Sequence, residues 1–141
     1  MTERKKALVT GGATGIGRSA VLALAKAGYD VAINYASSAK AAAATAKEAE
    51  ALGAKTLLVQ CDVSDEAGVR AMMKTVEAEF GHLDALINNA GTTASWKVKD
   101  LESLDLGEWD RTFAVNVRGT FQVTRAAVPL LKKGTNASIV N

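Results

Sequence analysis

The sequence predicts an α/β fold in which a doubly wound parallel β-sheet carries helices on both of its faces. Three observations predict it: short apolar runs alternate with longer amphipathic stretches, glycines stand at the junctions, and the alternation continues along the whole chain. Strands that alternate with helices form parallel sheets, because each helix carries the chain back to the end of the sheet where the strand began. The length of 141 residues fits one compact unit, so we expect a single domain over 1–141.

The individual elements follow from hydrophobic periodicity and from residues that start or stop helices. Strands are expected at 7–9, 31–33, 56–61 and 83–87, with a fifth that begins at 139. Helices are expected at 16–27, at 39–52, from the cap Ser64 to Gly81, and onward from the cap Asp105, with Pro129 bending or ending the last one. Apolar faces are predicted on the first helix at Ile16, Ala20, Leu24 and Ala27, and on the last helix at Trp109, Phe113, Val117 and Phe121. Because the sequence stops as the fifth strand starts, we expect a sheet truncated after that strand.

Composition argues against several classes of protein. Hydrophobic residues at 48% and charged residues at 23% are typical of a globular protein. The net charge of +2 and the lack of a basic stripe argue against a nucleic-acid partner. No apolar run approaches the ~18 residues of a membrane span, so we expect no membrane partner and a cytoplasmic location. The single cysteine, Cys61, is expected as a small buried side chain and the single histidine, His82, at the surface, which leaves no metal cluster.

The strongest functional signal is a glycine-rich turn between the first strand and the first helix. It reads T-G-G-A-T-G-I-G over 10–17. Backbone amides at a helix N-terminus attract a pyrophosphate. Gly11 allows a tight turn, Gly15 lets the phosphates approach the backbone, and Gly17 lets helix and strand pack closely. The turn therefore predicts a Rossmann-like nucleotide-binding domain whose site includes Gly11, Ala13, Thr14, Gly15, Ile16 and Gly17.

This spacing resembles the short-chain dehydrogenase/reductase family, whose turn reads T-G-x-x-x-G-x-G. Three further motifs stand in the family's order: C-D-V at 61–63, N-N-A-G at 88–91 and V-N-V at 115–117. The resemblance implies that Asp62, with Val63, binds the adenine amino group, and that Asn89, Ala90 and Gly91 lie beside the adenine ribose. The loop over 91–104 follows the carboxyl end of a strand, where ligands bind in such folds. Within the family, the chain is similar to 3-oxoacyl-acyl-carrier-protein reductases and sugar dehydrogenases.

The resemblance implies a nicotinamide cofactor, either NADP or NAD. An acid about 20 residues past the glycine turn would bind the ribose 2′-hydroxyl of NAD. The second strand instead leads into Asn34-Tyr35-Ala36-Ser37-Ser38, and Asp30 stands at its other end. Tyr35, Ser37 and Ser38 are the candidate residues here, and the two serines can donate to a 2′-phosphate. The sequence therefore favours NADP over NAD.

The resemblance also implies hydride transfer between the cofactor and a small-molecule carbonyl or alcohol substrate. The family's proton transfer uses a serine after the fifth strand, a Tyr-x-x-x-Lys pair and a helix asparagine, and of these the sequence contains only Asn116. Tyr29 and Tyr35 are followed four positions later by Ile33 and Ala39. We therefore expect a reductase that forms a homo-oligomer in its full-length form and is inactive as these 141 residues alone. The alternative is a non-catalytic nucleotide-binding or assembly fragment.

Overall fold

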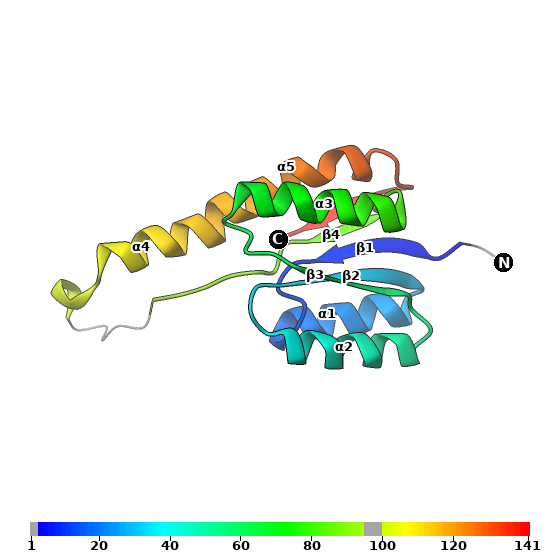
Figure 1. Ribbon diagram of the computed structural model, residues 1–141, viewed down its shortest axis with the longest axis horizontal. Helices are drawn as coiled ribbons and strands as arrows, with labels where there is room; N and C mark the ends of the chain where they lie inside the picture. Colours follow the sequence, from blue (N-terminus) through cyan, green and yellow to red (C-terminus); the bar gives the residue numbers. More distant parts are fainter. Residues whose placement is uncertain (1–2, 95–99) are drawn as a thin grey trace.

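A five-stranded parallel sheet forms the centre of the computed structural model, which describes residues 3–94 and 100–141 (Figure 1). The strands are β1 (Lys5–Val9), β2 (Tyr29–Tyr35), β3 (Thr56–Gln60), β4 (Ala85–Ile87) and β5 (Ser138–Val140). Their order in the sheet is β3-β2-β1-β4-β5, and every neighbouring pair is parallel. The order reverses direction between β1 and β4, as in doubly wound folds. The expected fold class is therefore confirmed.

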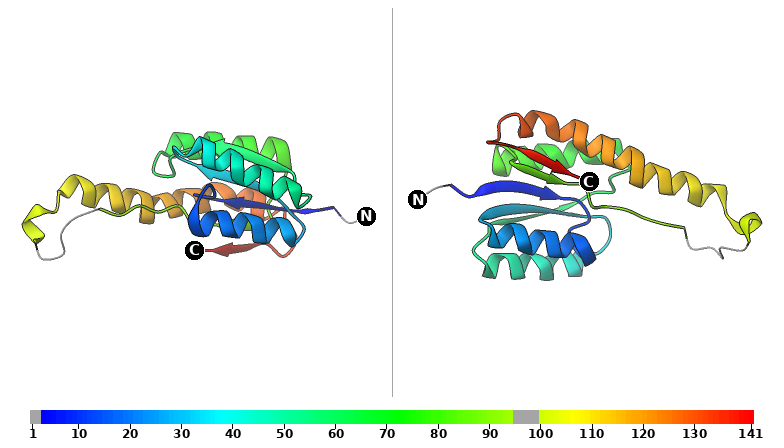
Figure 2. Two further views of the ribbon diagram at one scale, coloured as in Figure 1. Left: turned by 90° about the horizontal axis from the view of Figure 1, so that it is seen from below. Right: turned by 180° about the vertical axis from the view of Figure 1, so that it is seen from behind.

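Helices cover both faces of this sheet. The first face carries α1 (Gly15–Lys26) and α2 (Ala39–Ala51), and the second carries α3 (Glu66–Phe80) and α5 (Thr120–Leu131). A further helix, α4 (Leu106–Phe113), joins α5 through a π-helical segment, Ala114–Gly119, and extends beyond the body of the molecule (Figure 2). A short 3-10 turn, Leu101–Ser103, precedes α4. The expected loop over 91–104 contains residues 95–99, which lie outside the described part of the chain.

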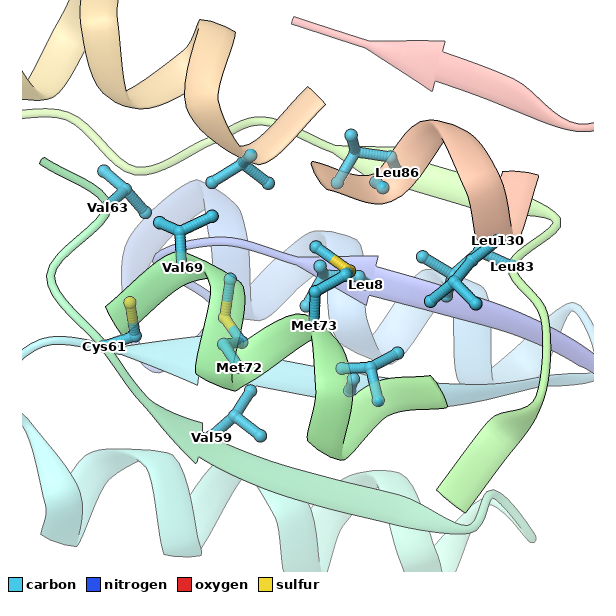
Figure 3. Close-up of a cluster of buried hydrophobic side chains, with 14 of the residues drawn as sticks. Leu8, Val59, Cys61, Val63, Val69, Met72, Met73, Leu83, Leu86 and Leu130 are labelled. Carbon is cyan, nitrogen blue, oxygen red and sulfur yellow. The ribbon is translucent and has the colours of Figure 1, made fainter. Parts of the chain in front are cut away.

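Two apolar clusters hold the helices to the sheet. Successive strand residues point to opposite faces, so Leu8 and Val9 of β1 belong to different clusters. On the second face, Leu8 packs with Met72, Met73 and other buried side chains of α3 and α5 (Figure 3). Cys61 belongs to the same cluster and is 7% exposed, which confirms the expectation of a small buried side chain.

The buried face of α1 differs from the expected one. The residues that face the core are Gly17, Val21 and Ala25, whereas Ile16 is 83% exposed. Both sets have the four-residue spacing of a helix face, so periodicity alone does not choose between them. The glycine turn decides, because Gly17 must face the turn. Positions four and eight residues later then point the same way.

The beginning of α3 and the last long helix also differ from expectation. The cap of α3 is Asp65, whose carboxylate accepts a hydrogen bond from the amide of Ala67 at 3.1 Å. Ser64, the expected cap, donates to Asp62 instead. Pro129 lies inside α5, which ends two residues later at Leu131, and the irregularity of this long helix is the π-helical segment Ala114–Gly119.

Buried ionic groups tie together the amino-terminal ends of the strands. Asp30 accepts hydrogen bonds from Arg4 at 3.0 Å and from Lys6 at 2.8 Å. Asp84, which immediately precedes β4, accepts from the amides of Lys6 and Thr135, both at 2.8 Å. His82 is partly exposed, and its Nε2 lies 3.2 Å from Asp84. These carboxylates link β1, β2, β4 and the loop before β5.

We predict that Asp84→Asn destabilises the chain. An asparagine offers one acceptor oxygen and a donor nitrogen, so one of the two backbone amides loses its acceptor, at a cost of about 1–3 kcal/mol. Burial alone would raise the pKa of Asp84, but the amides of Lys6 and Thr135 and the neighbouring His82 outweigh it and hold the pKa below its ordinary value. Urea denaturation at pH 7 measures the loss, and Asp110→Asn, at an exposed carboxylate on α4, is the control.

The same variant has an expected pH signature. A carboxylate whose pKa is lower in the folded state stabilises the protein above its unfolded pKa of about 4, and this stability is lost as the pH falls through the folded pKa. Asp84→Asn should therefore lose less stability than the native chain between pH 7 and pH 3. Equal losses in the two proteins would contradict the assigned role of Asp84.

Candidate functional site

The glycine turn leaves the amino-terminal end of α1 open. Gly11 and Gly15 have φ values of +61° and +57°, a left-handed conformation that favours glycine. The helical hydrogen bonds begin with the amide of Arg18, which donates to Thr14 O at 3.1 Å. The amides of 15–17 precede this first bond and point out of the helix end. A Cβ added at Gly15 would meet no atom within 4 Å, so this position at the start of α1 is open.

Gly17 packs directly against the glycine turn. A Cβ at Gly17 would lie 2.1 Å from Gly11 O and 2.5 Å from Asn89 Nδ2. Asn89 donates from that same nitrogen to Thr10 O at 3.1 Å and to Gly11 O at 3.0 Å. The close approach predicted at Gly17 is thus to the turn itself and to the residue that holds it.

Thr10 and Asn34 also hold the turn, and the motif pattern does not single them out as site residues. Thr10 Oγ1 accepts from the amides of Asn89 and Ala90, both at 3.0 Å. Asn34, 1% exposed, accepts from the amide of Gly11 and donates to the carbonyl oxygens of Val59 and Cys61. A polar residue inside an otherwise apolar strand is the signal that could have identified Asn34.

A cavity of about 380 Å³ lies beside the turn, at the carboxyl ends of the strands. It opens where the strand order reverses, which is the usual ligand position in such sheets. Eight of the predicted site residues line it: Gly11, Thr14, Ser37, Asp62, Val63, Asn89, Ala90 and Gly91. Six others complete the lining: Asn34, Ala36, Cys61, Thr92, Arg111 and Val115. The fold therefore gathers residues from five separate segments of the chain at one place.

The remaining predicted residues lie around this cavity without lining it. Ala13 and Gly17 are buried in the support of the turn, and Gly15 and Ile16 form the exposed start of α1. Tyr35 ends β2, and Ser38 borders a neighbouring hollow that it shares with Ser37.

Both polar groups of the Asn116 side chain form hydrogen bonds with the loop that follows β4. Its Oδ1 accepts from the amide of Thr92 and its Nδ2 donates to Thr92 O, each at 2.8 Å. Thr92 lines the cavity. Asn116 therefore holds the cavity wall against the π-helical segment.

Asp62 is the acidic group of the cavity. Its Oδ1 accepts from the amide of Ser64 at 2.9 Å and from Ser64 Oγ at 2.7 Å, and its Oδ2 accepts from Arg111 at 2.7 Å. Burial opposes the charged form, but the donors of Arg111 and Ser64 and the charge of Arg111 hold the pKa of Asp62 below its ordinary value. Burial raises the pKa of the adjacent Cys61 thiol to about 11, aided by the carboxylates of Asp65 and Asp62, so this thiol stays neutral.

Neither a membrane-spanning helix nor a metal-binding cluster is present among the described residues. None of the helices in residues 3–94 and 100–141 has the length and apolarity needed to cross a bilayer. Over the same residues, histidine, cysteine and carboxylate side chains form no group of three or more that could hold a metal ion.

An open helix N-terminus beside a cavity, at the point where the order of a parallel sheet reverses, is the architecture of a Rossmann-like fold. Residues 5–141 match the family described as short chain dehydrogenase. The chain belongs to this family.

Individual relatives agree with this assignment. The chain is 40% identical, over its whole length, to 3-oxoacyl-(acyl-carrier-protein) reductase FabG of Staphylococcus aureus (strain Mu50), and it spans 56% of that relative. A crystal structure of a short-chain dehydrogenase/reductase from Burkholderia xenovorans aligns with the chain at a TM-score of 0.92 and 35% identity. The alignment covers all of the present chain and 60% of the Burkholderia chain. The structure of a short chain dehydrogenase from Burkholderia cenocepacia J2315, in complex with NADP, aligns with a TM-score of 0.82 and 42% identity. This alignment covers 90% of the present chain and 51% of the Burkholderia cenocepacia chain.

Proposed function

We propose that this chain binds a nicotinamide dinucleotide for hydride transfer to or from a carbonyl or alcohol substrate. The observation that carries the proposal is the open end of α1, with three outward amides beside a cavity that contains an ionised Asp62. The proposal is supported by one relative whose structure is in complex with NADP and by another that is named as a reductase. The nicotinamide ring supplies or accepts the hydride when the cofactor is bound.

Different residues of the chain would bind different parts of the cofactor. The amides of 15–17 would bind the pyrophosphate, since a helix N-terminus favours anions. Asp62 would accept from the adenine amino group, with Val63 beside the ring, and Asn89, Ala90 and Gly91 would border the ribose. Ser37 and Ser38 would donate to a 2′-phosphate, near Tyr35. Asn116 would keep the loop at Thr92 in place beside the reacting groups.

The proposal is tested by titrating the chain with NADPH in a calorimeter. We expect saturable binding of one molecule, and competition by ADP-ribose, which carries the adenosine 5′-diphosphate of NADPH but neither its nicotinamide nor its 2′-phosphate. The absence of any binding would contradict the proposal.

Cofactor preference gives a second, finer prediction. Ala36 is exposed, follows β2 and lines the cavity. Ala36→Asp should weaken NADPH binding at least about tenfold, because the new carboxylate repels a 2′-phosphate. NADH binding should change less or improve. Ala36→Asn, which has the same shape without the charge, is the control, and a native chain that prefers NADH over NADPH would contradict the assignment to NADP.

A second candidate function is a nucleotide-binding or assembly module without catalysis. The observation that favours it is the lack of a Tyr-x-x-x-Lys pair among these 141 residues. NADPH oxidation with a generic ketone tests the non-catalytic function. We expect binding without turnover from these residues alone, and turnover comparable to that of an intact family member would exclude the non-catalytic function. The cytoplasmic location stays a prediction.

An exposed apolar stripe supports the proposal that the protein forms a homo-oligomer. Its side chains lie three or four residues apart along α4, the π-helical segment and α5 and are between 50% and 74% exposed: Leu106, Trp109, Phe113, Val117 and Phe121. The predicted apolar face of this helix is therefore open to solvent, where contiguous apolar surface indicates a protein partner. The spacing suits the same stripe on a second copy, and light scattering over a range of concentrations tests the association.

A further inference from the structure

Arg111 connects α4 to the cavity. α4 extends away from the sheet, and none of its residues is buried. From its last turn, Arg111 donates through Nη2 to Asp62 Oδ2 at 2.7 Å and through Nη1 to Ser64 Oγ at 2.8 Å. The guanidinium thus spans two residues of the loop after β3, and Arg111 itself lines the cavity.

The direction of every hydrogen bond in this group is determined by chemistry. Arginine only donates and an ionised carboxylate only accepts, so the hydroxyl of Ser64 accepts from Arg111 and donates to Asp62. Oδ1 of Asp62 has both of its acceptor positions occupied by Ser64, through its amide and its hydroxyl. Oδ2 receives one bond, from Arg111. One acceptor position on Oδ2 is left for a ligand in the cavity.

We propose that Arg111 is a positioning residue that selects adenine over 6-oxopurines by holding Asp62 as an oriented, acceptor-only carboxylate. The proposal rests on the proposed function, in which Asp62 meets the purine edge. The 6-amino group of adenine donates to such a carboxylate. The 6-oxo group of hypoxanthine is an acceptor, and placing it against the carboxylate sets two acceptors against each other.

Without Arg111 the preference for adenine over hypoxanthine should weaken for two reasons. Oδ2 loses its charge-assisted donor, so the carboxylate is held on one oxygen only and can rotate. Burial then favours protonation with less opposition, because Arg111 is one of the groups that lower the pKa of Asp62. A protonated carboxyl group can donate to the 6-oxo group, which removes the penalty against hypoxanthine.

The experiment compares the binding of NADPH with that of its hypoxanthine analogue, reduced nicotinamide hypoxanthine dinucleotide phosphate. Calorimetry gives Kd for each ligand, and the ratio of the two values is the readout. We expect the native chain to prefer the adenine form by about tenfold or more, since a site built to accept from an amino group rejects an analogue that lacks it. In Arg111→Gln the ratio should fall to about threefold or less.

Two further variants distinguish a role of Arg111 in selecting adenine from a purely structural role. Arg111→Lys restores the charge without the two-pronged geometry, so its ratio should lie between those of the native chain and Arg111→Gln. Arg118→Gln removes an exposed arginine of the π-helical segment and should leave the ratio unchanged. Circular dichroism verifies that each variant is folded.

The outcomes distinguish this proposal from the proposed function. If Arg111→Gln weakens both ligands equally and keeps the native ratio, Arg111 is only structural and the proposal fails while nucleotide binding stands. A native chain that binds both ligands equally well also overturns the role of Arg111. A native chain that binds neither overturns the proposed function and this inference together.

Discussion

Gly17→Ala is expected to abolish nucleotide binding and to destabilise the chain severely. The new methyl group would lie 2.1 Å from Gly11 O and 2.5 Å from Asn89 Nδ2, and both atoms belong to the turn and its support. The turn must therefore move away from α1. That movement breaks the two hydrogen bonds from Asn89 to Thr10 and Gly11. Overpacking together with the lost hydrogen bonds should cost about 3 kcal/mol or more.

Urea denaturation followed by circular dichroism measures this loss, and calorimetry with NADPH measures binding. Ser19→Ala, two residues along on the exposed side of α1, is the control and should preserve both properties. A Gly17→Ala chain with native stability and native Kd would show that α1 and the turn can separate without cost. The role assigned to Gly17 would then be wrong.

Gly15→Val is expected to abolish nucleotide binding while the chain remains folded. An added Cβ at Gly15 meets no protein atom within 4 Å, so a side chain fits there without a clash and projects into the open space at the start of α1, where the proposed pyrophosphate would bind. A pyrophosphate needs the same space, and Kd for NADPH should rise about a hundredfold or more, equivalent to about 2.7 kcal/mol. Stability should fall by only about 1–3 kcal/mol, which is the strain of a non-glycine residue at φ +57°.

Gly15→Ala separates the two contributions to this effect. It shares the unfavourable backbone conformation but fills less of the space, so its Kd should lie between those of the native chain and Gly15→Val. Equal affinity of the native chain and Gly15→Val would mean that phosphate does not bind at this helix end. A comparison with Gly17→Ala is also informative, because both variants should lose binding but Gly17→Ala should lose more stability than Gly15→Val.

Local pattern was sufficient to predict much of the fold and part of the site. The alternation of strands and helices, the glycine turn and the ends of β3 and β4 are each contained in a few consecutive residues. Because parallel strands end at one edge of a sheet, Asp62 and Asn89 could be expected near Gly11, and all three line one cavity. Residues whose role depends on a distant partner were not predicted: Thr10 and Asn34 act through β3 and β4, and Arg111 acts through the loop after β3.

The sequence by itself determined the order of the elements, the parallel sheet and the position of the glycine turn, because these depend on periodicity and on the backbone freedom of glycine. Tertiary structure alone decided which side of α1 is buried, and that the apolar stripe of α4 and α5 is not. Val21 and Ala25 face the core because Gly17 must fit beneath Gly11, whereas the equally periodic stripe at Trp109, Phe113 and Phe121 remains exposed. Spacing along a helix defines a face, but only the neighbouring elements determine what that face contacts, and those neighbours come from residues far away in the chain.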